Sequence, residues 1–77
     1  NAMDMKLWLR QKIADEAGLS ADQISLDEEF DNFKLDSLSL ISLSYELESV
    51  VDRDISPTVF IEYNTINMLA EWMGTQK

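Results

Sequence analysis

The stretch LDSLSLISLSYELESVV, residues 35–51, decides the fold of this chain. A polar, acidic segment gives way here to the strongest helical pattern in the sequence, and we predict a helix over Ser37 to Val51. The apolar residues on one face follow helical spacing and are assigned to the core: Leu40, Leu43, Leu47, Val50 and Val51. A second apolar stripe lies about 60° or more away around the helix and begins beside Ser37: Leu38, Ile41 and Tyr45.

Ser37 stands at the first turn of this helix, where two interpretations are open. Asp and Ser are common at helix starts because their side chains accept hydrogen bonds from the first backbone N–H groups. A serine there also lies where unpaired N–H groups and the positive end of the helix dipole would stabilise a phosphate ester on its oxygen. The two roles are compatible, because Asp36 can cap the helix while Ser37 faces outward. A reciprocal capping box at Ser37 would need Glu or Gln three residues later, where the chain has Leu40. The Ser37 hydroxyl is therefore not needed for such a box.

Composition excludes several classes of function. The 77 residues make one small domain without room for an enzyme cleft. The chain has no cysteine and no histidine, which rules out a disulfide framework and a Ser-His-Asp mechanism at Ser37. The net charge of −9 should repel nucleic acid and anionic lipid; it either attracts basic partner proteins or only keeps the domain in solution. An EF-hand starting at Asp27 would have Asn32 and Leu38 at its sixth and twelfth positions, so no metal site is predicted.

The ends of the chain and its apolar runs indicate a cytoplasmic protein. No run approaches the length of a membrane span, and no charged-then-apolar leader is present. Asn1 and Ala2 resemble a remnant of tag removal, and residues 3–77 are expected to form one domain. Met3 is then the expected native start, which favours a free-standing protein.

A first helix and a long loop precede the central helix. The helix is predicted from Met5 to Ala17, with Asp4 as its cap and Gly18 as its stop. The pattern loses its period over residues 19–35, apart from a capping box at Ser20 that starts a single turn. A loop this long needs to be pinned, and four apolar residues are expected to do so: Ile24, Leu26, Phe30 and Phe33.

The last third of the chain predicts one short and one longer helix. Pro57 can open the short helix over Val59 to Tyr63, in which Phe60, Ile61 and Tyr63 are expected to pack into the core. Thr65 is expected to cap the last helix and Gly74 to end it. The core face of that helix consists of Ile66, Leu69, Ala70 and Met73, and its outward face of Asn67, Glu71 and Gln76.

These segments together predict an all-α fold. Four amphipathic segments without strand alternation indicate a small antiparallel four-helix bundle, made of three main helices and one short helix. Its core is expected to contain Leu9, Ile13, Leu43, Leu47, Phe60, Ile66 and Leu69.

Two stretches resemble a known family. The run FDNFKLDSL, residues 30–38, with the helix that ends in YELE at 45–48, resembles the phosphopantetheine attachment site of acyl carrier proteins. The run ISPTVFIEYNTI, residues 55–66, followed by LAE at 69–71, resembles the third and fourth helices of polyketide synthase carrier domains. Both matches keep the family's spacing, and together they cover nearly the whole chain.

The resemblance implies an acyl-carrier-protein-like fold and a carrier that is not itself an enzyme. A phosphopantetheinyl transferase would move 4′-phosphopantetheine from coenzyme A onto the Ser37 oxygen, which makes the chain a phosphoprotein, and Asp36 would contact that transferase. Acyl intermediates would then travel as thioesters on the arm. The carrier would pass them between partner enzymes of polyketide or fatty-acid-like biosynthesis that have basic docking patches. These partners would be an acyltransferase and a ketosynthase, or acyl-activating enzymes. The family's contact positions correspond to Leu38, Ile41, Tyr45 and Glu48, with Ile61 as a secondary contact.

Departures from the family pattern also carry information. Ser39 and Ser42 stand where fatty-acid carriers commonly have acids, so partner contacts should depend more on apolar and hydroxyl groups. Lys34 replaces a glycine that is frequent in the family, which suggests a turn that tolerates a side chain. A monomer is expected. Two alternatives stay open: a peptidyl or aminoacyl carrier of non-ribosomal peptide synthesis, and a helical interaction domain that is never modified.

Overall fold

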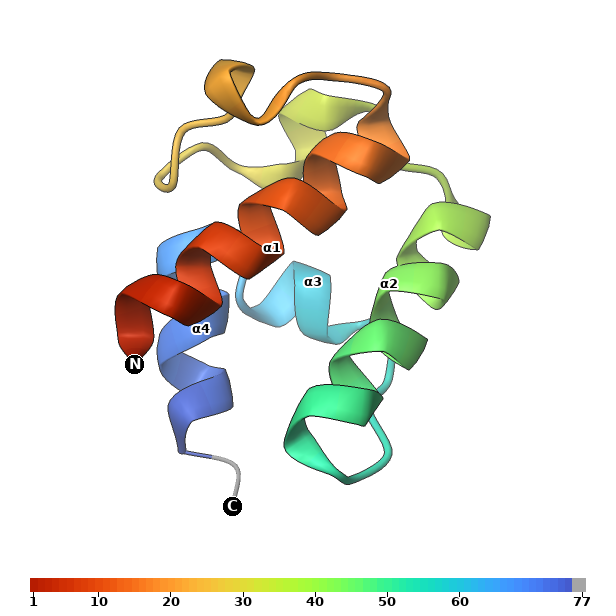
Figure 1. Ribbon diagram of the computed structural model, residues 1–77. Coiled ribbons are helices and arrows are strands. Elements are labelled where there is room, and N and C mark those ends of the chain that lie inside the picture. The colour runs from red at the N-terminus through yellow and green to blue at the C-terminus, as the bar shows by residue number, and fades with distance from the viewer. Residues whose placement is uncertain (76–77) are drawn as a thin grey trace.

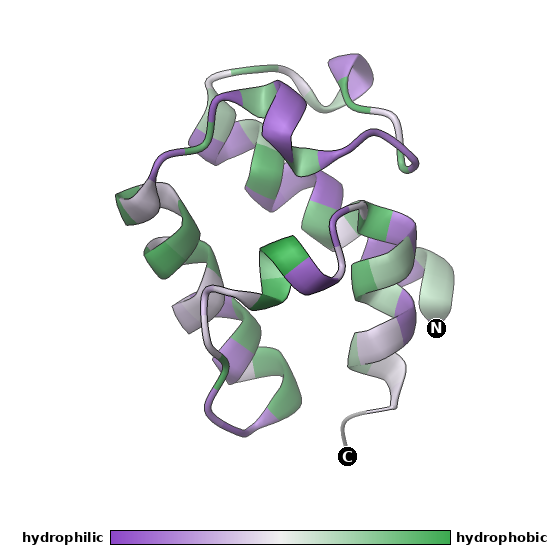
Figure 2. Ribbon diagram, turned by 180° about the vertical axis from the view of Figure 1, so that it is seen from behind, coloured by the Kyte–Doolittle hydropathy of each residue, from purple (hydrophilic) through white to green (hydrophobic). Residues whose placement is uncertain are grey.

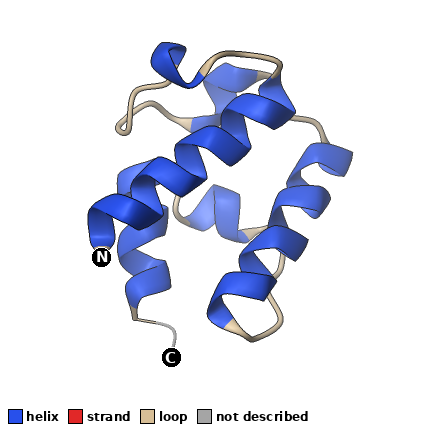
Figure 3. Ribbon diagram, viewed as in Figure 1, coloured by secondary structure: helices blue, strands red, loops and turns tan. Residues whose placement is uncertain are grey.

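The computed structural model describes residues 1–75, and every regular element in that range is helical (Figures 1 and 3). The main helices are α1 (Ala2–Ala17), α2 (Ser37–Val51) and α4 (Ile66–Gly74), and the short helix is α3 (Val59–Glu62). Two 3₁₀ turns, η1 (Ala21–Gln23) and η2 (Phe30–Phe33), lie between α1 and α2. In Figure 1, α1 runs upward while α2 and α4 run downward. The predicted antiparallel all-α fold and the bounds of the central helix are confirmed.

Helix α1 begins earlier than the sequence predicted, because Asn1 rather than Asp4 is its cap. The Asn1 side chain accepts a hydrogen bond from the Asp4 backbone N–H (3.0 Å), and the Asp4 carboxylate accepts one from the Asn1 amino group (3.1 Å). This reciprocal pair is a capping box, so Asn1 and Ala2 extend the helix. At the other end Gly18 adopts the left-handed conformation (φ 71°) and donates its N–H to the Ala14 carbonyl, as predicted for a stop.

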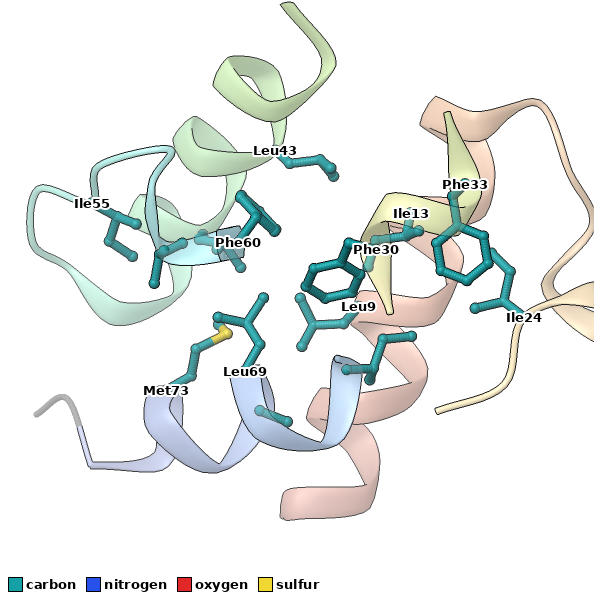
Figure 4. Close-up of a cluster of buried hydrophobic side chains, with 14 of the residues drawn as sticks. Leu9, Ile13, Ile24, Phe30, Phe33, Leu43, Ile55, Phe60, Leu69 and Met73 are labelled. Atoms are coloured by element: carbon teal, nitrogen blue, oxygen red, sulfur yellow. The ribbon is translucent and has the colours of Figure 1, made fainter. Parts of the chain in front are cut away.

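The core lies between α1, α4, α3 and the inner face of α2 (Figure 4). All seven predicted core residues are buried, and so are the four residues of the predicted core face of α4. Phe30 and Phe60 meet edge to face with ring centroids 5.6 Å apart, which joins η2 to α3. Within residues 1–75, no helix combines the length and the apolar content that crossing a membrane would require.

Two residues predicted to be in the core are exposed, and a buried polar residue was not predicted. Val50 is 42% exposed because the buried arc of α2 is centred on Leu43, Leu47 and Val51, which leaves Val50 at its edge. Ile61 is 73% exposed because α3 is a single turn whose buried side is Val59 and Phe60.

The buried polar residue is Ser44, which lies on the inner side of α2. It donates its hydroxyl to the Ile41 carbonyl (2.7 Å), and this bond within the helix satisfies the polar group. Helix α4 ends at Gly74, as predicted, and Thr75 is its cap. The predicted outward residue Gln76 lies outside the described residues.

The long loop before α2 is pinned to the turn between α3 and α4. Phe30 donates its N–H to the Asn64 carbonyl (2.9 Å), and Asn67 donates its N–H to the Leu26 carbonyl (3.0 Å). The side chain of Asn64 donates to Glu29 (3.1 Å), and that of Asn67 donates to Asp27. Of the predicted anchors, Ile24, Phe30 and Phe33 are buried and Leu26 is half-buried. Asn67, expected to face outward, is therefore half-buried because it holds this loop.

Candidate functional site

The first turn of α2 holds Ser37 in the solvent. Asp36 is the cap: its carboxylate accepts a hydrogen bond from the Ser39 backbone N–H (2.8 Å), as the sequence predicted. The hydrogen bonds from the Ser39 backbone and side chain hold the pKa of Asp36 below its ordinary value of 3.8. Ser37 is the first helical residue and is exposed, and its hydroxyl forms no hydrogen bond within residues 1–75. The oxygen is therefore free to react at the positive end of a helix.

The turn that leads into α2 is made by Lys34. This residue adopts the left-handed conformation (φ 55°, ψ 40°), which glycine adopts without a steric penalty. The sequence analysis expected a turn that tolerates a side chain there, and the chain does place a lysine in it. The lysine side chain is exposed and brings a positive charge into the segment just before Ser37.

The second apolar stripe of α2 is exposed, as the resemblance to acyl carrier proteins implied. Leu38 is 76% exposed, Tyr45 is 66% exposed and Ile41 is 38% exposed. Ile61 of α3 lies near this stripe, since residues of both helices line one surface hollow of about 220 Å³. This hollow is lined by Ser37, Leu40, Ile41, Pro57, Thr58 and Ile61. Side chains from both helices thus form an apolar surface beside the serine, which we call the Ser37 face: Leu38, Ile41, Tyr45 and Ile61.

The acids near the end of α2 have structural partners that the sequence did not reveal. Glu48 accepts a hydrogen bond from the Ile55 backbone N–H (2.8 Å) and is half-buried, so it holds the loop between α2 and α3. Glu46 pairs with Lys12 of α1 (2.9 Å), and the Lys12 ammonium lies 5.7 Å from the centre of the Trp8 ring. The pairing with Glu46 raises the pKa of Lys12. Of the predicted docking residues, Glu48 is therefore the one already engaged within the fold.

Two hydroxyl groups line the hollow, and that of Thr58 is hydrogen-bonded to Ser56 and Glu62. The sequence contains no histidine or cysteine that could activate Ser37, and the described residues form no cluster of three potential metal ligands. The features that the sequence analysis missed are Thr58 and Pro57 in the hollow, because nothing in their own spacing relates them to Ser37. Only the packing of α3 against α2 brings them together.

Comparisons with known proteins give matches over most of the chain. A family model described as the phosphopantetheine attachment site matches residues 7–73. Among curated proteins, the polyketide synthase PksL of Bacillus subtilis is 32% identical to this chain over 66 residues. That match covers 86% of this chain but only 2% of PksL, so the chain spans a small part of such a relative.

Solved structures share the fold. A free-standing peptidyl carrier protein from an Acinetobacter baumannii secondary metabolic pathway superposes with a TM-score of 0.91 at 29% identity. That superposition covers 97% of this chain and 94% of the other. BlmI, a type-II acyl carrier protein of Streptomyces verticillus, superposes with a TM-score of 0.81 over 95% of this chain and 86% of its own. Its 19% identity shows similarity of fold alone.

Proposed function

Given that the chain belongs to the phosphopantetheine attachment site family, we propose that it is an acyl carrier protein that bears 4′-phosphopantetheine on Ser37. Members of this family carry that group covalently. The observation that carries the assignment of Ser37 is its exposed hydroxyl at the start of α2. That hydroxyl has no hydrogen-bond partner within residues 1–75, while Asp36 does the capping.

The local chemistry fits a phosphate ester. The backbone N–H groups of the first turn and the helix dipole favour negative charge at this end of α2. Lys34, just before the turn, adds a positive charge in the same segment. Ser37 would supply only the oxygen, and a phosphopantetheinyl transferase would take its proton, because this chain has no histidine. When bound, the group supplies a terminal thiol that holds acyl groups as thioesters, which a chain without cysteine cannot offer.

The Ser37 face would present the attachment point to partner enzymes. Leu38, Tyr45 and Ile61 are large apolar side chains that the fold leaves in water, and exposed apolar patches next to a functional group favour protein binding. The chain's net charge of −9 would guide basic docking patches toward it. Glu48 accepts a hydrogen bond from the Ile55 N–H that holds its side chain in place, so it would act in steering through its charge more than through direct contact.

Two kinds of cargo are supported by different relatives. The similarity to PksL favours acyl intermediates of polyketide or fatty-acid-like synthesis, with an acyltransferase and a ketosynthase as partners. The second candidate is an aminoacyl or peptidyl carrier, served by an acyl-activating enzyme, and the close superposition on a free-standing peptidyl carrier protein favours it. In either case the chain would be a non-catalytic, cytoplasmic monomer that leaves each partner after the transfer.

Intact-mass spectrometry tests the proposal. The protein is incubated with coenzyme A, magnesium and a broad-specificity phosphopantetheinyl transferase. The wild-type chain should gain one phosphopantetheinyl group, and Ser37→Ala should gain none while keeping its helicity. Ser42→Ala is the matched control, because it removes another exposed serine of α2 and should load like the wild type. Failure of the wild type with several transferases would favour the unmodified interaction domain, with Ser37 as part of a helix start only.

A further inference from the structure

A second apolar hollow is lined by α4 and by Tyr63, which follows α3, whereas the Ser37 hollow is lined by α2, α3 and the residues just before α3. In Figure 2, α3 lies between α2 and α4. The volume of the second hollow is about 360 Å³. It is lined by Tyr63 and by residues that follow one face of α4 and its cap: Met68, Glu71, Trp72 and Thr75. We call this surface the α4 groove. Its residues have no part in the proposed attachment of phosphopantetheine.

An aromatic pair lines the α4 groove. The rings of Tyr63 and Trp72 stack with centroids 5.3 Å apart and planes inclined by 21°. Both residues are half-buried, so the packing of each ring against the other holds the pair in place while part of it meets the solvent. Met68, at the side of the groove, is 45% exposed. Held aromatic faces beside a flexible thioether make a surface suited to an incoming flat group.

The rim of the α4 groove is acidic. Glu71 lines it, is exposed, and forms no ion pair within residues 1–75. An adjoining hollow of about 180 Å³ shares Tyr63 and Trp72 with the groove and adds Glu62. Arg53 lines that second hollow but not the first, so the Glu71 end is the end that favours an added positive charge.

We propose that the α4 groove binds an arginine side chain from a basic, amphipathic segment of a partner protein. A guanidinium is planar and stacks on aromatic faces, and its fork of N–H donors matches a carboxylate such as that of Glu71. A lysine ammonium lacks the plane and the fork, and so fits this pairing less well. Apolar side chains next to the arginine would lie on Met68. The acidic charge of the whole chain attracts such a segment from a distance.

The position of the α4 groove determines which residues stay accessible when it is occupied. Because the α4 groove and the Ser37 hollow have no lining residue in common, a segment held at Tyr63 and Trp72 would leave the residues around Ser37 uncovered. The chain can then stay attached to one protein while the serine, or whatever it carries, meets another. This binding does not depend on modification of Ser37, so it can be tested on the unmodified protein.

The test uses two peptides and the two tryptophans of the chain. One blocked peptide alternates arginine with leucine, and its matched control replaces every arginine by neutral citrulline. Indole N–H resonances are followed by NMR during titration of the unmodified full chain. We expect the Trp72 resonance to shift and saturate with the arginine peptide, and to need at least tenfold more of the citrulline peptide. Trp8, on α1, is the internal reference and should stay in place.

Variants separate a site from general attraction to an acidic protein. Glu71→Gln should weaken binding of the arginine peptide about two- to fivefold, the range expected for one exposed ion pair. Glu16→Gln removes the same charge from the exposed surface of α1 and should leave the affinity unchanged. Equal shifts of Trp8 and Trp72, or equal losses in the two variants, would overturn the proposal in favour of unspecific attraction. A Trp72 resonance that does not move at millimolar peptide would overturn it as well, whether or not Ser37 accepts phosphopantetheine.

Discussion

Helices α2 and α4 are both amphipathic, but α2 leaves more apolar surface in water: Leu38 is 76% exposed and Tyr45 66%, against 45% for Met68 of α4. In α4, Ile66, Leu69, Ala70 and Met73 form one face, and all four are buried. In α2 the buried face is joined by a second stripe that the fold leaves in water, which includes Leu38 and Tyr45. The two helices therefore differ in how much of their apolar surface the fold buries.

The difference indicates which residues the fold itself requires. Burial of apolar surface is the main force that holds a domain together, so the stripe of α4 is explained by stability. The second stripe of α2 contributes little to the core, and exposed apolar surface also carries a risk of association. Its place beside Ser37 is therefore better explained by binding than by folding.

The largest expected effect compares one leucine from each helix. Leu69→Ala in α4 should lower the free energy of unfolding by about 2–5 kcal/mol, because it leaves a cavity in the core. Leu38→Ala in α2 should change it by no more than about 0.5 kcal/mol, because the side chain is exposed. Urea denaturation followed by circular dichroism measures both. A comparable loss in Leu38→Ala would mean that the second stripe is part of the core after all.

A smaller effect is expected for function along α2. Tyr45→Ala should slow the transfer of acyl groups to and from partner enzymes several-fold, while its melting temperature stays close to that of the wild type. Val50→Ala is the matched control, since Val50 is also exposed on α2 but lies at the other edge of its buried face. Transfer rates are followed by mass spectrometry of the loaded chain. If both variants slow transfer equally, docking is not confined to the Ser37 face.

Much of this comparison could be predicted from the sequence. The exposure of Leu38 and Tyr45 was implied by the family resemblance, whereas the bounds of α2, the cap at Asp36 and the core face of α4 all follow from local spacing. Such features depend on residues three or four positions apart, and a single sequence contains that information.

What the sequence did not predict depends on contacts between distant segments. Glu48 looks like a free surface acid until the loop after α2 brings the Ile55 N–H to it. Ile61 looks like a core residue until α3 proves too short to bury more than one side. The stacking of Tyr63 on Trp72 likewise depends on how α3 and α4 pack. The spacing of residues within one segment does not predict these contacts between segments.

The smallest expected effect concerns how the two helices are bounded. Helix α2 lies between two non-glycine residues in the left-handed conformation, Lys34 (φ 55°) and Asp52 (φ 57°), whereas α4 lies between Thr65 and Thr75, neither of which has a positive φ. A residue with a Cβ pays roughly 1–2 kcal/mol there, and glycine avoids that cost but loses roughly 0.5–1 kcal/mol of chain entropy. Lys34→Gly should therefore stabilise the domain by about 0.5–1 kcal/mol.

Asp52→Gly is the control for this last comparison, because aspartate visits the left-handed region more readily than lysine. Its gain should be the smaller of the two. Thermal melting measures both, since a gain of about 1 kcal/mol moves the midpoint of a domain this size by roughly 4–8 °C. A loss of stability in Lys34→Gly would mean that the lysine side chain contributes more than its backbone costs. The lysine at position 34, where the family often has glycine, would then be explained by the positive charge that it places before Ser37. The geometry of this turn would be linked to the chemistry of the serine that follows it.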